Sequence, residues 1–238
     1  MATYVLIHGA GSDSWYWHLV APRLRARGHD VVAPDLPSDD DSAGLAEYVE
    51  VVLDAIGGRS DLIVVGQSLA GFTAPLVCAQ VPVSLLVLVA AMVPMPGEPP
   101  GEWWVHTRWA EARRRQAELD GRPIAADIDP MAEFFHDVPP DLVSEAMARG
   151  ERIQSGTPFE KAWPLDAWPE VPTRFILCRN DRFFPPEFLR RVVDERLGIT
   201  PDELDAGHLP ALSQPGELVD RLEAYRLACE QRVNQNQQ

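Results

Sequence analysis

Short, unbroken runs of aliphatic residues recur along the chain. They are rich in valine, isoleucine and leucine, each is too short for a helix, and they fall at residues 4–7, 30–33, 62–65, 85–89 and 175–178. Continuous apolarity, as opposed to an alternation of apolar and polar positions, is typical of strands buried on both faces, as in a parallel sheet. The runs therefore predict the strands of such a sheet.

Segments with a helical pattern lie between these runs, at residues 22–27, 44–56, 186–197 and 215–233. The segment that starts at Pro186 is followed by Gly198, and proline at the start with glycine past the end is a common asymmetry of helices. Strands that alternate with helices indicate a doubly wound α/β sheet. The polar tail, 234–238, is expected to fray.

One stretch, residues 94–169, interrupts this alternation. It has no convincing strand pattern and is rich in tryptophan, arginine, glutamate and proline, and helical pieces are expected at 102–119, 131–135 and 141–153. An insertion of this size between core strands commonly forms a lid or a binding surface. We therefore expect one domain, 1–238, with a core from about 1–93 and 170–238 and a cap from about 94–169.

Composition narrows the possible partners. The 238 residues include 21 Lys and Arg against 36 Asp and Glu, which gives a formal charge of −15. So acidic a surface repels nucleic acid and anionic membranes, and neither is expected as a partner. The longest apolar run, 83–96, is too short to cross a bilayer, and the N-terminus lacks the pattern of a secretory signal. A cytoplasmic location is expected; the sequence carries no signal for oligomeric state.

Cysteine and metal-binding patterns are equally informative. The three cysteines are scattered and form neither a disulfide framework nor a Cys-x-x-Cys pair. No group of His, Cys, Asp or Glu has the spacing of metal ligands, so neither a metal nor a cofactor is expected.

The strand at 62–65 runs into the motif Gly-Gln-Ser-Leu-Ala-Gly and then into a predicted helix. A serine at a sharp strand-to-helix turn is lifted out of the sheet, and its strained backbone requires small residues two positions to either side. Gly66 and Ala70 meet that requirement. Ser68 is therefore the predicted nucleophile, and the amide of Leu69, at a helix N-terminus, is a predicted oxyanion donor. The alternative is a glycine-containing turn with an incidental serine.

The strand at 4–7 opens into His8-Gly9-Ala10-Gly11. Such a turn beside the nucleophile can offer a second backbone N–H to an oxyanion, and Ala10 is the predicted donor. Gly9 is expected to contact substrate, and His8 to be a structural hydrogen-bonding residue. A phosphate-binding loop is the alternative, but both Gly-x-Gly-x-x-Gly and Gly-Lys-Ser/Thr are missing.

A nucleophilic serine requires a general base. On a sheet of this kind the triad runs in the order serine, acid, histidine, which leaves His106, His136 and His208. The first two lie in the expected cap, where a base is hard to hold rigidly. His208 lies in a loop just before the last predicted helix and is the predicted base.

The acid has to orient the imidazole and stabilise its charged form. Asp181 directly follows the strand at 175–178, and catalytic groups gather at the carboxyl edge of open α/β sheets. Asp181 is therefore the predicted acid, with Asp205 and Asp166 as alternatives. In the cap, Trp103 and Trp104 are expected to contact substrate; the alternative is that they only pack the cap onto the core.

Together these segments resemble a known family. Residues 8–17 and 28–36 resemble the opening of the hydroxynitrile lyase and plant methylesterase branch of α/β-hydrolases; residues 66–71, 178–181 and 207–215 match its nucleophile elbow, acid loop and histidine loop. The resemblance covers about two thirds of the chain and fades through the cap. It implies the α/β-hydrolase fold: about six mostly parallel strands, helices on both faces, a helical cap inserted before the last two strands, and a triad of Ser68, Asp181 and His208.

The resemblance also bears on the reaction. In the lyases of this branch a threonine follows the first-strand histidine and a lysine follows the catalytic histidine, whereas Gly9 and Leu209 stand here. Without that ammonium group, hydrolysis of a small to medium carboxylic ester is favoured over cyanohydrin cleavage. Lactone or carbon–carbon hydrolysis, perhydrolysis, a lyase reaction and a small-molecule receptor remain alternatives. The chain departs from the family pattern at Asp13-Ser14, Gln67 and Ala70.

Overall fold

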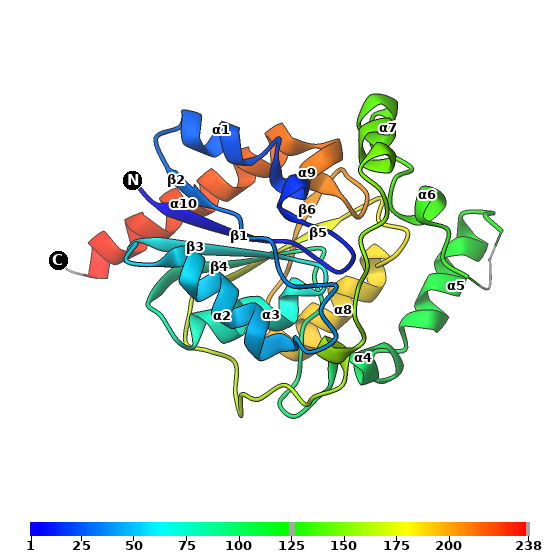
Figure 1. The fold of residues 1–238 in the computed structure, drawn as a ribbon, viewed down its shortest axis with the longest axis horizontal. Helices are drawn as coiled ribbons and strands as arrows, with labels where there is room; N and C mark the ends of the chain where they lie inside the picture. Colours follow the sequence, from blue (N-terminus) through cyan, green and yellow to red (C-terminus); the bar gives the residue numbers. More distant parts are fainter. Residues whose placement is uncertain (124–126, 237–238) are drawn as a thin grey trace.

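The computed structural model describes residues 1–123 and 127–236, in which six parallel strands form one sheet (Figure 1). Its order is β2-β1-β3-β4-β5-β6. The strands are β1 (Thr3–Ile7), β2 (Asp30–Val32), β3 (Leu62–Gln67), β4 (Val83–Val89), β5 (Thr173–Cys178) and β6 (Asp202–Leu204). The predicted sheet is confirmed, and every aliphatic run forms a strand. Only β6 was not predicted.

Burial explains why these runs form the centre of the sheet. Every residue of β1 and of β3 is buried. Because successive side chains of a strand point to opposite faces, Val5 and Ile7 enter one hydrophobic cluster, whereas Tyr4 and Leu6 enter another. Both faces of the sheet are therefore core, which requires helices on both sides.

Helices cover both faces, as predicted. Those on one face are α2 (Leu45–Ile56), α3 (Ala70–Cys78) and α8 (Pro186–Leu197), and those on the other are α1 (Ala21–Ala26) and α10 (Pro215–Asn236) (Figure 1). Two short helices, η1 (Ser14–Trp17) and α9 (Pro210–Ser213), follow β1 and β6. The helix at 186–197 has the predicted bounds. The last helix is longer than predicted and includes residues 234–236 of the tail; the rest of that tail lies outside the described residues.

The chain between β4 and β5 builds the helices at the right of Figure 1. They are α4 (Pro100–His106), α5 (Trp109–Leu119), α6 (Pro130–Glu133), α7 (Pro140–Ala148) and η2 (Thr157–Phe159). The described part of 94–169 contains no strand, and residues 124–126 of the expected cap lie outside the described chain. The helix expected over 102–119 is in fact two helices, separated at Arg108, whose φ is 60°.

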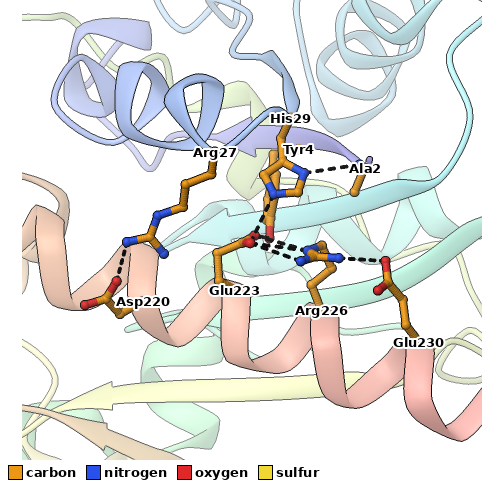
Figure 2. A network of polar contacts seen from close by, with 8 residues as sticks. All are labelled: Ala2, Tyr4, Arg27, His29, Asp220, Glu223, Arg226 and Glu230. Carbon is orange, nitrogen blue, oxygen red and sulfur yellow. Dashed lines mark hydrogen bonds and ion pairs between the residues drawn. The ribbon is translucent and has the colours of Figure 1, made fainter.

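Polar contacts join α10 to the start of the sheet (Figure 2). The Glu223 carboxylate accepts hydrogen bonds from the Tyr4 hydroxyl on β1 and from Arg226, and lies 3.0 Å from Nε2 of His29. The other ring nitrogen of His29 accepts the Ala2 amide at 3.2 Å. The cluster lies where β1 begins and fixes that end of the sheet.

Candidate active site

The turn after β3 gives Ser68 an unusual backbone. Its φ is 53°, in the left-handed region that a non-glycine residue adopts at a cost. A Cβ on Gly66 would lie 2.9 Å from the Cβ of Ala74, and one on Gly71 would lie 1.8 Å from the carbonyl oxygen of Met92. Because α3 and the chain after β4 pack this closely, the turn requires glycine at both positions. The strained serine stands at the carboxyl end of the sheet.

Three side chains distant in sequence meet at this turn. Nε2 of His208 lies 3.2 Å from Oγ of Ser68, and its Nδ1 lies 2.8 Å from Oδ2 of Asp181. The imidazole and the carboxylate are both nearly inaccessible to solvent, with residue exposures of 3% and 2%. A carboxylate beside Nδ1 places the ring proton on that nitrogen, so Nε2 is free to accept the proton of the serine hydroxyl.

The remaining oxygen of Asp181 is also occupied. Oδ1 accepts the amides of Phe183 and Phe184 at 2.9 and 2.8 Å, which fixes the plane of the carboxylate. The rings of the same two phenylalanines lie 5.1 Å from the His208 ring. On the other side of the histidine loop, Nε2 of Gln67 donates to the carbonyl of His208 at 3.1 Å. Both the ring and the main chain of this histidine are therefore held.

Three of the alternative acids and bases lie away from these side chains. Asp205 is exposed and accepts a hydrogen bond from Asn180, and Asp166 is exposed as well. His106 pairs with Glu98 at 2.8 Å. The structure thus brings together the predicted serine, histidine and first-choice aspartate, whereas the alternative base His136 lies beside Gly207 but does not border the cavity that Ser68 and His208 line.

The loop after β1 contributes main-chain groups. Ala10 and Leu69 border the same cavity as Ser68 and His208, and neither amide donates to another atom within the described chain. Gly9 instead packs directly behind the serine, where a Cβ would lie 2.8 Å from the serine Cβ, and it does not border this cavity. Gly9 thus lies outside the cavity wall in which its substrate contact was expected.

His8 has the structural role that was expected. Its Nδ1 lies 2.9 Å from the carbonyl oxygen of Gly9, and its Nε2 accepts the amide of Leu36 at 3.1 Å. One donor and one acceptor describe a neutral imidazole. Burial lowers the pKa of His8, which keeps the ring neutral and the turn in place.

A cavity of about 670 Å³ opens above the serine. Its wall is mostly apolar and aromatic, and includes Trp15, Leu69, Met92, Trp104, Met131, Phe134, Met147, Phe159 and Phe183. Trp104 borders the cavity as expected, but Trp103 does not. Trp103 is fully buried, and its indole N–H donates to the carbonyl of Val93 at 3.0 Å, so this ring packs the cap onto the core.

Charged groups at the cavity were not anticipated from the sequence. Asp13, which follows β1, forms ion pairs with Arg149 at 2.8 Å and with Arg152 at 2.5 Å. The side-chain oxygen of Gln154 accepts the amide of Gly11 at 3.2 Å. The segment after α7, residues 149–154, is thereby fastened to the loop after β1, and we call it the strap. The departure from the family pattern at Asp13 was the available sequence signal.

Within residues 1–123 and 127–236, no three His, Cys, Asp or Glu side chains are grouped so that they could hold a metal ion. None of the helices described is both long and apolar enough to cross a bilayer.

Comparison with known proteins agrees with the fold and with the resemblance. Methylesterase 9 of Arabidopsis thaliana is 25% identical over 256 residues, covering 93% of this chain and 97% of its own. A pyrethroid hydrolase of Sphingobium wenxiniae is 26% identical, covering 92% and 85%. The structure of polyneuridine aldehyde esterase superposes with a TM-score of 0.75 at 20% identity, covering 94% of this chain and 99% of that one, which shows the shared fold.

The resemblance to the methylesterase branch is thus confirmed on the esterase side. The profile described as the Alpha/beta hydrolase family matches residues 4–221, nearly the whole chain. This protein belongs to the alpha/beta hydrolase family.

Proposed function

We propose that the protein is a cofactor-free carboxylic ester hydrolase in which Ser68 is the nucleophile, His208 the general base and Asp181 the orienting acid. One observation carries the proposal: the imidazole bridges the serine hydroxyl and the aspartate carboxylate, at 3.2 and 2.8 Å. Those lengths suit proton transfer from a hydroxyl to an imidazole.

The reaction follows from this geometry. Oγ of Ser68 attacks the ester carbonyl carbon while its proton passes to Nε2 of His208. The imidazolium is stabilised by the carboxylate of Asp181, whose oxygens accept the amides of Phe183 and Phe184 and the ring N–H. Nε2–H then protonates the leaving alkoxide, and the C–O bond to the alcohol breaks. The acyl-enzyme remains.

Hydrolysis of the acyl-enzyme reverses these roles. Nε2 of His208 takes a proton from water, the hydroxide attacks the acyl carbon, and collapse of the tetrahedral species returns the proton to Oγ of Ser68 and releases the acid. In both steps the amides of Ala10 and Leu69 hold the oxyanion. One such donor contributes about 3 kcal/mol of transition-state stabilisation.

The cavity indicates the kind of ester. A volume of about 670 Å³ with a mostly apolar wall suits an ester of small to medium size with an apolar acyl or alcohol group. Leu209 borders the cavity beside His208, where a lyase of the resembled branch has its lysine, so hydrolysis is favoured over cyanohydrin cleavage. Relatives named methylesterase and pyrethroid hydrolase support an ester as substrate.

The net charge of the protein bears on its binding partners. With a formal charge of −15, a neutral small molecule is the favoured partner, and nucleic acid and anionic membranes are disfavoured. A cytoplasmic location belongs to the same proposal.

A fluorophosphonate probe and a panel of aryl and alkyl esters test the proposal. The wild type is expected to be labelled at Ser68 and to hydrolyse esters, whereas Ser68→Ala loses labelling and about 10⁴-fold or more of kcat. Ser60→Ala, an exposed serine, is the matched control. Labelling that persists in Ser68→Ala contradicts the choice of nucleophile. Labelling without turnover of any ester or lactone indicates a receptor built on a hydrolase fold.

A further inference from the structure

A turn of the cap touches both loops that carry the proposed triad. We call residues 132–138, at the end of α6 and before α7, the cap turn. The carbonyl of Ala132 accepts a hydrogen bond from Arg182, next to Asp181, at 3.0 Å. The ring of Phe134 lies 5.4 Å from that of His208.

The cap turn is itself firmly anchored. The carboxylate of Glu133 pairs with Arg113 of α5 at 2.8 Å, and both side chains are largely buried. Val138 is 6% exposed and belongs to the hydrophobic cluster beneath the histidine loop, together with Tyr16 and Leu212. A turn held at both ends can fix whatever its remaining side chains contact.

Asp137 contacts the residue that precedes the catalytic histidine. Its Oδ2 accepts the amide of Gly207 at 2.5 Å. A Cβ on Gly207 would lie 2.5 Å from the other carboxylate oxygen and 2.9 Å from Nε2 of His136, so the cap turn occupies the space that a side chain at 207 would need. A hydrogen bond to a carboxylate is about twice as strong as a neutral one.

We propose that Asp137 is a positioning residue, which sets the main chain at Gly207 so that Nε2 of His208 faces the serine; the inference rests on the proposed function. Asp181 holds the imidazole at Nδ1, and the neighbouring phenylalanine rings limit but do not abolish a pivot about that atom. The pivot is fixed by the main chain on both sides of the ring: Asp137 binds the amide before it, and Gln67 binds the carbonyl at 3.1 Å.

The geometry shows why this contact matters for turnover. The distance from Nε2 to Oγ is 3.2 Å, and a shift of about 1 Å breaks the hydrogen bond through which the proton moves. Most of the cavity wall comes from segments other than the histidine loop and keeps its place in such a shift. Loss of Asp137 should therefore lower kcat and leave KM nearly unchanged.

The test compares Asp137→Ala with Asp137→Asn, whose amide oxygen can still accept the Gly207 amide. Asp137→Ala is expected to lower kcat about 10- to 100-fold with KM within about twofold, whereas Asp137→Asn keeps kcat within about threefold of wild type. Asp141→Ala, an exposed aspartate at the start of α7, is the matched control and is expected to match wild type. Thermal unfolding of each variant checks that it is folded.

A second variant approaches the same contact from the core. Gly207→Ala pushes the carboxylate away and is expected to lower kcat like Asp137→Ala, while the double variant loses little more than either single one. Additive losses, or a folded Asp137→Ala with the kcat of wild type, overturn the inference. If Asp137→Ala does not fold, the other two variants test the inference. The kcat of Gly207→Ala should fall while that of Asp137→Asn stays near wild type. The inference fails if both kcat values fall equally or if neither falls.

Failure of the proposed function gives a different result. In that case the wild type turns over no ester, or Ser68→Ala keeps the labelling and turnover of wild type. Normal wild-type turnover with no loss in Asp137→Ala removes the role of Asp137 alone.

Discussion

Trp103 and Trp104 are adjacent in sequence and in edge-to-face contact, with ring centroids 5.3 Å apart, yet only Trp104 borders the cavity. Trp103 is fully buried against Phe184 and Phe188 and bonds the carbonyl of Val93. The two neighbouring rings therefore have different roles. Trp103 packs the cap onto the core, and Trp104 borders the cavity above the serine.

Substitution by alanine should therefore mainly lower stability at Trp103 and mainly lower ester turnover at Trp104. Trp103→Ala should lower the free energy of unfolding by about 3–5 kcal/mol, because it leaves a large internal cavity. Trp104→Ala should cost less stability but lower kcat/KM for bulky apolar esters by about tenfold, since part of the substrate-facing wall is lost. Urea unfolding and steady-state kinetics measure the two effects, and each variant is the control for the other. A stable Trp103→Ala with impaired substrate binding would contradict the assignment.

Gln67 connects the nucleophile turn to the histidine loop. In Gln67→Leu the carbonyl of His208 loses its buried donor, a change that costs about 1–3 kcal/mol. We expect kcat to fall about tenfold while KM changes little, because the histidine is displaced and the cavity wall is conserved. Gln80→Leu, an exposed glutamine, is the control. The expectation fails if Gln67→Leu retains both wild-type kcat and wild-type stability.

The ion pairs of Asp13 should protect the strap from proteolysis. Asp13→Ser keeps an oxygen that can accept the Trp15 amide but removes the charge that pairs with Arg149 and Arg152. Both arginines are partly exposed, so their pairs contribute about 0.2–1 kcal/mol each, and trypsin cleavage after either should quicken about two- to fivefold. Mass spectrometry of the fragments gives the cleavage sites.

A measurement at high salt distinguishes loss of the strap's ion pairs from a general loss of stability. High salt, about 0.5 M, should accelerate cleavage of wild type and leave Asp13→Ser almost unchanged, because screening weakens only a charge pair that exists. Asp220→Ser, which removes the surface pair with Arg27, is the control. Equal salt effects in wild type and Asp13→Ser would mean that the ion pairs do not hold the strap.

The strands could be read from the sequence because their aliphatic runs are buried on both faces. β6 was not predicted because it has only three residues, two of them the acidic Asp202 and Glu203. The break between α4 and α5 was not predicted for another reason, because a tertiary contact holds it. Arg191 of α8 donates a hydrogen bond to the carbonyl of Thr107, the residue directly before the break. Local propensity favours one continuous helix there.

The site shows the same limit. Ser68 and His208 were recognisable because each lies in a local motif whose neighbours are constrained. Asp13 and Arg149 are 136 positions apart, and no local pattern connects them. Trp103 and Trp104 are the same residue type in one helix, and only tertiary packing decides which ring is buried. Chemistry carried by a motif is thus predictable, whereas contacts made across the cap are not.

The cluster around Glu223 should make stability depend on pH (Figure 2). Burial by itself raises the pKa of this carboxyl, but hydrogen bonds from Tyr4, Arg226 and His29 outweigh it, so the pKa in the folded protein lies below its ordinary value of 4.5. The folded state therefore binds this proton less readily than the unfolded chain. The stability that results is present above pH 4.5 and is lost as the pH falls through the folded pKa.

Glu223→Gln removes this charge and should therefore be less stable than wild type at neutral pH. The difference in free energy of unfolding between the two proteins should shrink as the pH falls below 4.5, because the wild-type carboxyl then becomes neutral as well. Urea unfolding at pH 7, 5, 4 and 3 measures it, with Glu230→Gln, an exposed partner of Arg226, as control. A difference that stays constant across this range would mean that the cluster stabilises the sheet through shape alone and not through the charge of Glu223.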